Sequence, residues 1–306
     1  MRIPMPDRWQ TRLLAILLLA ASTWAAAQDN ADATRLSGTL AKVRESGTIV
    51  LGYRESSVPF SYLSAQGEPI GYSIDLCKLL VEAMVEEVGR DIVIRWQMVT
   101  AESRLNAVSS GAVDLECGST TSNLERQKQV SFSPIFFVSG TKLLVKKGSP
   151  IRSFRNLAGK TVVVTAGTTN EKTMKDLAAR FQIDMKIVSA PDHAASFARL
   201  TNGQADAFAT DDVLLYGQLA QNRQQGKYVV TGDFLSYDPY GLMFRKGDAQ
   251  LARLVNDTFH SLAKDGEIER RYTRWFLRKL PNGTSLDLPM SPQLVTIIET
   301  MVVRSE

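Results

Sequence analysis

The 306-residue sequence is poor in the residues that build metal sites. It contains only two histidines, His193 and His260, and two cysteines, Cys77 and Cys117, and the two kinds are far apart along the chain. No zinc-type ligand spacing, Gly-rich phosphate loop or Ser-His-Asp set stands out. We therefore expect neither a metal nor a cofactor.

The sequence also lacks a strong charge bias and a membrane-spanning run. Its formal net charge is +4, with no basic block or aromatic-basic stripe, so a nucleic-acid partner is not expected. Residues 1–27 have the pattern of a secretory signal peptide: early arginines, a short apolar run and three alanines at the expected cleavage point. An uncleaved anchor is the alternative, but that run is shorter than the ~20 apolar residues a span needs.

Export raises the possibility of a disulfide between Cys77 and Cys117. Two buried free thiols are the alternative, because sequence alone does not supply the Cα separation that a bridge requires. Both interpretations stay open at this point.

Predicted strands alternate with predicted helices, which indicates an α/β protein with mainly parallel sheets. Small hydroxyl, glycine or charged residues follow each of six predicted strands. These strands are residues 49–53, 92–99, 113–117, 161–164, 186–189 and 206–210. Ligands of open α/β sheets bind beyond the carboxyl ends of the strands. Two such sheets facing each other would direct all six clusters at one small molecule.

Helices are predicted between the strands from apolar spacing and end signals. Ser73 is expected to cap the first of them, and Gly89 to end it in the left-handed conformation. Further helices are expected at residues 104–110, 171–181, 192–201 and 212–221.

Two extended apolar stretches, residues 132–147 and 237–246, are interpreted as strands that cross between two lobes. Lobe 1 would then comprise residues 38–138 and 238–306, and lobe 2 residues 139–237. Two adjacent crossing strands make a natural hinge.

Several blocks, in order along nearly the whole chain, resemble the glutamate/aspartate-binding proteins of bacterial ABC importers, within the polar amino acid solute-binding family. The blocks are RESSVPFSY (54–62), ECGSTT (116–121), ERQKQ (125–129), VVVT (162–165), GTT (167–169), SA (189–190), DH (192–193), DD (211–212) and YG (240–241). The resemblance implies a type II periplasmic binding protein fold, with two α/β sheets joined by two crossing strands. It also implies location in the periplasm, delivery of ligand to an ABC permease, and a monomer.

The residue chemistry fits an amino acid ligand. Arg126 can hold an α-carboxylate bidentately, and Thr121 can add a hydroxyl donor. Thr168 and Thr169 stand at a helix N-terminus, which favours an anion. The α-ammonium would be bound by Asp211 and Ser119, and the resemblance implies the same roles.

Arg54, Arg104 and His193 remain to bind a second, side-chain carboxylate. Three arginines against one aspartate would leave cations unpaired around a neutral amino acid, which is costly in a desolvated cleft. L-Glutamate or L-aspartate supplies the missing charge. One departure from the resemblance is Ala101, where the acidic-ligand proteins carry serine, so that one hydroxyl contact is absent.

Each of these residues also has a plainer interpretation. Arg54 could pair with Glu55, Arg104 with Glu102 or Asp114, and Arg126 could be a solvated helix charge. Asp211 could cap the following helix, and His193 could be a hydrogen-bonded turn residue.

Three other functions are alternatives: a cyclic-acid dehydratase on the same fold, a binder of a neutral polar amino acid, and the sensor module of a receptor. We expect no enzymatic activity, because the predicted cleft suits binding better than proton transfer. A sensor would need a membrane helix, and none is predicted after the signal peptide.

Overall fold

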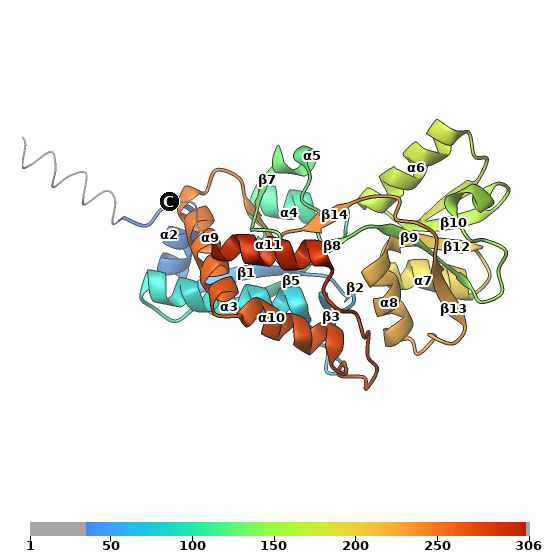
Figure 1. The fold of residues 1–306 in the computed structure, drawn as a ribbon. Helices are drawn as coiled ribbons and strands as arrows, with labels where there is room; N and C mark the ends of the chain where they lie inside the picture. Colours follow the sequence, from blue (N-terminus) through green and yellow to red (C-terminus); the bar gives the residue numbers. More distant parts are fainter. Residues whose placement is uncertain (1–34, 304–306) are drawn as a thin grey trace, which may run out of the picture. The chain divides into compact units, whose positions relative to one another are not determined.

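The computed structural model describes residues 35–303, so the predicted signal peptide lies outside the described residues. The fold below is that of the unit that begins at Gly38. Within residues 35–303, no helix combines the length and apolar character that a membrane span requires. Strands and helices alternate along this unit, as predicted for an α/β protein (Figure 1).

The first sheet has five strands. Their order is β5 (Val93–Met98), β1 (Thr48–Tyr53), β6 (Leu115–Glu116), β15 (Met243–Arg245) and β7 (Val130–Phe132). β1 runs parallel to β5 and β6, whereas β15 is antiparallel to β6 and β7. The polar segments that follow β1, β5 and β6 therefore leave the sheet at one edge.

A small antiparallel sheet and eight helical segments accompany this sheet. The small sheet contains β2 (Ser56–Ser57), β3 (Ser61–Leu63) and β4 (Pro69–Ile70). The helical segments are α2 (Gly38–Ser46), α3 (Tyr72–Val88), α4 (Arg104–Ser110), α5 (Leu124–Gln127), α9 (Ala249–Lys264), α10 (Glu267–Tyr272), η2 (Thr273–Leu277) and α11 (Pro292–Val302).

Helix α3 confirms its predicted end and corrects its predicted start. It ends at Gly89 in the left-handed conformation, with φ of 68°. Ser73 was expected to be the N-cap, but the helix begins at Tyr72, with Gly71 as the N-cap. The Ser73 hydroxyl is already used, because it donates to the carbonyl oxygen of Gly118 at 2.8 Å.

Cys77 and Cys117 form a disulfide, with their Cα atoms 6.1 Å apart. The two cysteines are therefore a disulfide and not two buried free thiols. The bond fixes α3 to the segment that immediately follows β6. That segment continues into Ser119 and Thr121, two of the predicted ligand-binding residues.

The second sheet also has five strands. Their order is β11 (Lys186–Ala190), β10 (Thr161–Thr165), β12 (Ala207–Asp211), β9 (Thr141–Lys146) and β13 (Tyr228–Thr231). β10 runs parallel to β11 and β12, and β9 is antiparallel to β12 and β13. Its helices are η1 (Phe154–Leu157), α6 (Thr169–Phe181), α7 (His193–Thr201) and α8 (Asp212–Gln221).

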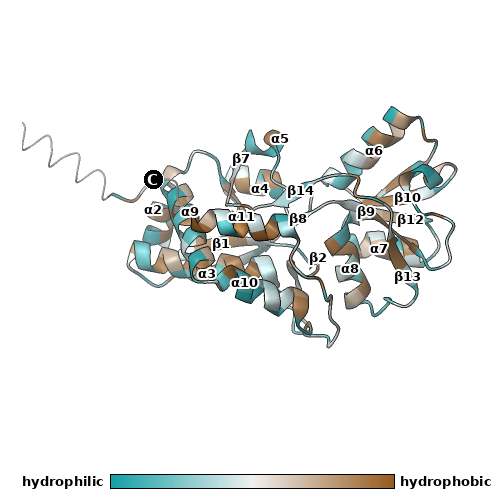
Figure 2. Cartoon of the chain, in the orientation of Figure 1, coloured by the Kyte–Doolittle hydropathy of each residue, from teal (hydrophilic) through white to brown (hydrophobic). Residues whose placement is uncertain are grey.

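Both faces of this second sheet are buried. Val162 and Val164 of β10 pack into one core with Met174 of α6, whereas Val163 faces the other core with Phe197 of α7. This explains the unbroken apolar run in β10, which is typical of parallel strands covered on both sides. Figure 2 shows the hydrophobic character of these central strands. The cores thus hold the carboxyl ends of β10 and β12 in fixed positions.

The two stretches expected to be continuous crossing strands are each divided. Residues 132–147 contribute the end of β7, then β8 (Phe137–Ser139) and β9, and residues 237–246 contribute β14 (Asp238–Tyr240) and β15. β8 and β14 pair with each other in a separate antiparallel ribbon. A break follows at Gly140, where a Cβ atom would lie 2.2 Å from the carbonyl oxygen of Ser236. The lobe limits given above stay a prediction.

Candidate functional site

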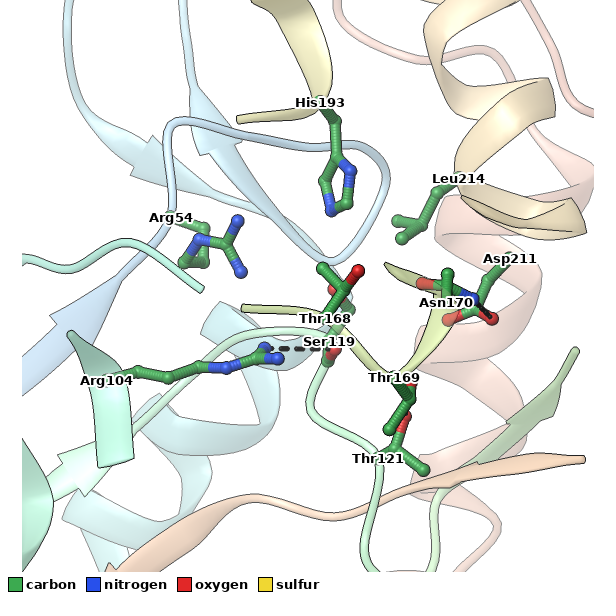
Figure 3. Close-up of a pocket in the computed structure, with 10 residues that line it drawn as sticks. All are labelled: Arg54, Arg104, Ser119, Thr121, Thr168, Thr169, Asn170, His193, Asp211 and Leu214. Atoms are coloured by element: carbon green, nitrogen blue, oxygen red, sulfur yellow. Dashed lines mark hydrogen bonds between the residues drawn. The ribbon is translucent and has the colours of Figure 1, made fainter. Parts of the chain in front are cut away.

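A small polar cavity lies beyond the ends of strands from both five-stranded sheets (Figure 3). Eight of the nine predicted ligand-binding residues line it, and Arg126 is the exception. The lining residues are Arg54, Arg104, Ser119, Thr121, Thr168, Thr169, Asn170, His193, Asp211 and Leu214. The strand-end clusters therefore converge as expected.

Arg54 and Arg104 place two buried guanidinium groups at one end of the cavity. Each is only 2% exposed. Arg104 Nη1 donates to Thr120 Oγ1 at 2.7 Å and to the carbonyl oxygen of Ser119 at 3.3 Å. Among residues 35–303, neither Nη2 of Arg54 nor Nε of Arg104 has a hydrogen-bond partner. Unpartnered buried donors on charged groups are costly, so this end of the cavity is suited to an anion.

The surface ion pairs proposed as alternatives for these arginines do not form. Asp114 pairs with Lys42 at 2.7 Å instead of with Arg104. Burial, and then the charge of Arg104, lower the pKa of Arg54 to about 10. Burial also lowers the pKa of Arg104. With a pKa of about 10, Arg54 still carries a positive charge at neutral pH.

The negative charge of Glu116 raises the pKa of both Arg54 and Arg104. The sequence interpretation did not include Glu116 among the site residues. It is fully buried at the end of β6, and its Oε2 accepts a hydrogen bond from Thr120 Oγ1 at 2.8 Å. Because Thr120 also accepts from Arg104, Glu116 orients Arg104 through this hydroxyl.

Arg126 lies beside the cavity on α5, where it joins segments of both sheets. Its Nη1 donates to the carbonyl oxygen of Thr121 at 2.9 Å, and its Nη2 makes a long contact of 3.5 Å with the carbonyl oxygen of Gly167. Burial, and then Arg104, lower its pKa to about 9. The side chain is 7% exposed, so it is not a solvated helix charge.

Asp211 ends β12 and lies opposite the arginines. Its Oδ1 accepts from Asn170 Nδ2 at 2.7 Å, and its Oδ2 accepts from the hydroxyl of Tyr240. Asp211 is the N-cap residue of α8, but its side chain makes no cap hydrogen bond, so capping does not account for its carboxylate. Burial, and then Asp238, raise its pKa well above the usual value. A cationic ammonium beside it would offset that penalty.

Asp238, Asn170 and Leu214 are further site residues that the sequence interpretation missed. Thr121 Oγ1 and Thr169 Oγ1 both donate to Asp238 Oδ1, at 2.9 and 2.8 Å. Asp238 thus aligns one predicted ligand-binding hydroxyl from each sheet. Its place at the start of a predicted crossing strand was the available signal. The count of three arginines against one aspartate is corrected accordingly, because Glu116 and Asp238 are also buried nearby.

Thr168 and His193 begin helices at the cavity. Thr168 is the N-cap of α6, and its hydroxyl accepts from Glu171 N at 3.1 Å. His193 is the first residue of α7, and its Nδ1 lies 2.9 Å from Thr165 Oγ1. Burial, and then Arg54 and Arg104, lower its pKa well below 6.5. The positive ends of two helices therefore meet the arginines at this cavity.

Direct contacts beside the cavity join the two halves of the site. Gln218 Nε2 of α8 donates to the carbonyl oxygen of Ser56 at 2.7 Å. A Cβ atom on the preceding residue, Gly217, would lie 2.0 Å from the carbonyl oxygen of Val58. The backbone of α8 and the segment around Val58 therefore approach each other so closely that only a glycine fits between them.

Comparison with known proteins gives consistent results. The bacterial extracellular solute-binding proteins, family 3, match residues 49–278. An L-glutamate/L-aspartate-binding protein of Pseudomonas aeruginosa is 45% identical over 269 residues, which cover 87% of this chain and 89% of that protein. A glutamate/aspartate import solute-binding protein of Escherichia coli K12 is 42% identical, covering 93% and 95%.

A solved structure extends the likeness to the fold. It is an ancestral amino acid-binding protein, described as a precursor of cyclohexadienyl dehydratase. It is 30% identical, covers 78% of this chain and 99% of its own, and superposes with a TM-score of 0.67. These findings confirm the type II two-lobed α/β fold predicted from the sequence.

Proposed function

The chain belongs to family 3 of the bacterial extracellular solute-binding proteins, and from that premise we propose that it captures L-glutamate or L-aspartate for an ABC permease. The observation that carries the proposal is the pair of buried arginines, Arg54 and Arg104, which both line the cavity and each have an N–H without a hydrogen-bond partner among the described residues. The names of the relatives from Pseudomonas aeruginosa and Escherichia coli support it.

In this proposal the ligand's two ends have different partners. The α-carboxylate binds Arg126, Thr121 and the N-terminus of α6, and the α-ammonium binds Asp211 and Ser119. Ser119 Oγ is buried without a partner among the described residues, which leaves it available to the ligand. The side-chain carboxylate binds at the end formed by Arg54, Arg104 and His193.

The location of the charges supports an acidic ligand more strongly than their number does. Asp211 lies across the cavity from Arg54 (Figure 3), where it accepts from Asn170 and Tyr240. Asp238 already accepts from the hydroxyls of Thr121 and Thr169. Around Arg54, Glu116 and Asp192 are the carboxylates that raise its pKa, and their effect is smaller than that of burial and Arg104. A ligand carboxylate placed there would compensate the two guanidinium groups.

We also propose that the protein acts in the periplasm after removal of residues 1–27, and that it is a binder rather than an enzyme. The dehydratase alternative needs a proton-transferring group over the substrate. Asp211 is the single carboxylate of the cavity lining, and it is already held by two donors. The imidazole of the lining, His193, has in this proposal the role of binding the side-chain carboxylate. Incubation with prephenate is expected to yield no product.

Ligand class is tested by thermal unfolding with a panel of amino acids. Glutamate and aspartate should raise the melting temperature, because a ligand at 100 times its Kd stabilises by about 2.7 kcal/mol. Lysine, arginine and histidine should give no shift, because their side chains would add charge beside Arg54 and Arg104. A shift with basic amino acids and none with acidic ones would overturn the proposal.

Selectivity is tested by replacing Arg54 or Arg104 with alanine. Each change should weaken the binding of glutamate far more than the binding of glutamine. Glutamate loses a charge-assisted hydrogen bond. For glutamine, the change also removes a cation that its neutral amide leaves unpaired. The ratio of the glutamine Kd to the glutamate Kd should therefore fall sharply, as measured by calorimetric titration. Arg155→Ala, on η1 of the second sheet, is the matched control. Equal weakening of the binding of both ligands would show that these arginines do not distinguish the ligand's side-chain carboxylate from an amide.

A further inference from the structure

A chain of hydroxyl groups behind His193 determines which ring nitrogen carries a proton. Ser196 Oγ donates to the carbonyl oxygen of Asp192 at 2.9 Å. Thr165 Oγ1 lies 2.8 Å from Ser196 Oγ and 2.9 Å from His193 Nδ1. His193, Ser196 and Thr165 are at most 1% exposed, so water does not replace these partners.

Each hydroxyl has one hydrogen, and this fixes the direction of the chain. All three contacts can be hydrogen bonds at once in only one arrangement, in which Ser196 donates to the carbonyl oxygen of Asp192, because a carbonyl can only accept. Thr165 must then donate to Ser196, and its oxygen is left to accept from His193 Nδ1. The proton of a neutral imidazole therefore sits on Nδ1, and Nε2 is an unprotonated acceptor. Figure 3 shows the ring directed into the cavity, between Arg54 and Leu214.

The surroundings of His193 keep the unliganded ring neutral. It is the first residue of α7, where the helix dipole disfavours a cation. Arg54 and Arg104 face it across the cavity, and both lower its pKa after burial itself. The elements packed against α7 contribute few other titratable groups. These are Lys186 at the exposed start of β11, Asp211 at the end of β12, and Asp212 and Tyr216 on α8.

We propose that an acidic ligand binds together with one proton, which is added from solvent to Nε2 of His193. This inference rests on the proposed function. A carboxylate placed against an unprotonated Nε2 would meet a lone pair, whereas a new Nε2–H bond turns that contact into a charge-assisted hydrogen bond. The ligand's negative charge also offsets Arg54 and Arg104, which disfavour the imidazolium in the free protein. No bond of the ligand breaks.

The sign of the pH dependence follows from the higher pKa of His193 in the complex. Between the free and the bound pKa, glutamate affinity should fall about tenfold for each unit of rising pH, because a proton must be taken up. Glutamine should behave differently, since its amide N–H can donate to the unprotonated Nε2. The glutamate/glutamine preference should therefore decrease as the pH rises.

The proton count is measured by calorimetric titration at a fixed pH in two buffers that differ in ionisation enthalpy. Glutamate should bind with uptake of close to one proton at neutral pH, and glutamine with none. The chain has only two histidines. ¹⁵N spectra of the imidazoles should therefore show Nε2 of His193 becoming protonated on glutamate binding, with His260 as the reference.

Ser196→Ala separates the hydroxyl chain from a merely structural role. Without Ser196 Oγ, Thr165 is free to donate to Nδ1, which moves the proton of the neutral ring to Nε2. This variant should bind glutamate without proton uptake and with a flat pH profile. Ser261→Ala is the matched control, because Ser261 makes the same bond to a carbonyl four residues back at an exposed position of α9.

Three results are informative. Proton uptake by the native chain and Ser261→Ala, but not by Ser196→Ala, supports the proposal. Glutamate binding by the native chain without proton uptake overturns it and leaves the proposed function intact. No glutamate binding by the native chain overturns the proposed function itself, and this inference with it.

Discussion

Arg126→Ala is expected to abolish or severely weaken the binding of every amino acid ligand. The side chain is buried, and its guanidinium already joins the Thr121 and Gly167 carbonyl oxygens. In our proposal it also holds the α-carboxylate that all amino acids share. Truncating a buried, hydrogen-bonded charge costs about 2–5 kcal/mol, or roughly 30- to 5,000-fold in Kd.

The effect should be similar for glutamate and glutamine, in contrast to the Arg54 and Arg104 variants, and calorimetric titration measures both. Lys128→Ala is the matched control, because Lys128 directly follows α5 and forms an exposed pair with Glu125. Near-normal glutamate binding by Arg126→Ala would show that Arg126 does not bind the ligand.

Gly217→Ala is expected to impair closure of the cleft without impairing the fold. The new Cβ would lie 2.0 Å from the carbonyl oxygen of Val58, so the two halves would have to separate. Overpacking of this kind costs about 1–3 kcal/mol, or roughly 5- to 150-fold in Kd. Gly217 lies inside α8, where alanine is favoured over glycine by about 1 kcal/mol.

The unliganded variant should therefore melt no lower than the native protein, while its ligand affinity falls. Thermal unfolding and titration of the same sample measure both effects. Gly226→Ala is the matched control, because nothing lies within 4 Å of a Cβ at that position. Native affinity in Gly217→Ala would mean that ligand binds without this contact.

The central strands were predictable because their burial has a sequence signature. The run at residues 162–164 is apolar because both faces of β10 are covered, and the turn that follows β10 is polar because it reaches the cavity. The crossing segments were less predictable. Both segments are extended and rich in apolar residues, so the sequence does not show that β7 and β15 remain in the first sheet while β9 enters the second.

The residues that line the cavity were easier to predict than the residues behind them. Arg54, Arg104 and Asp211 follow strand ends, which is a local pattern. Glu116 and Asp238 look like ordinary strand residues, and their importance comes from burial beside groups distant in sequence. The direction of the hydroxyl chain behind His193 likewise depends on distances that sequence does not contain.

The most direct test of the central claim is calorimetric titration of the native protein with L-glutamate and L-glutamine under identical conditions. The two ligands share their α-groups and differ only in a carboxylate against an amide at the far end. If Arg54 and Arg104 bind that carboxylate, glutamate should bind more tightly than glutamine by about 2–5 kcal/mol, roughly 30-fold or more in Kd. Equal affinities, or tighter binding of glutamine, would contradict the account.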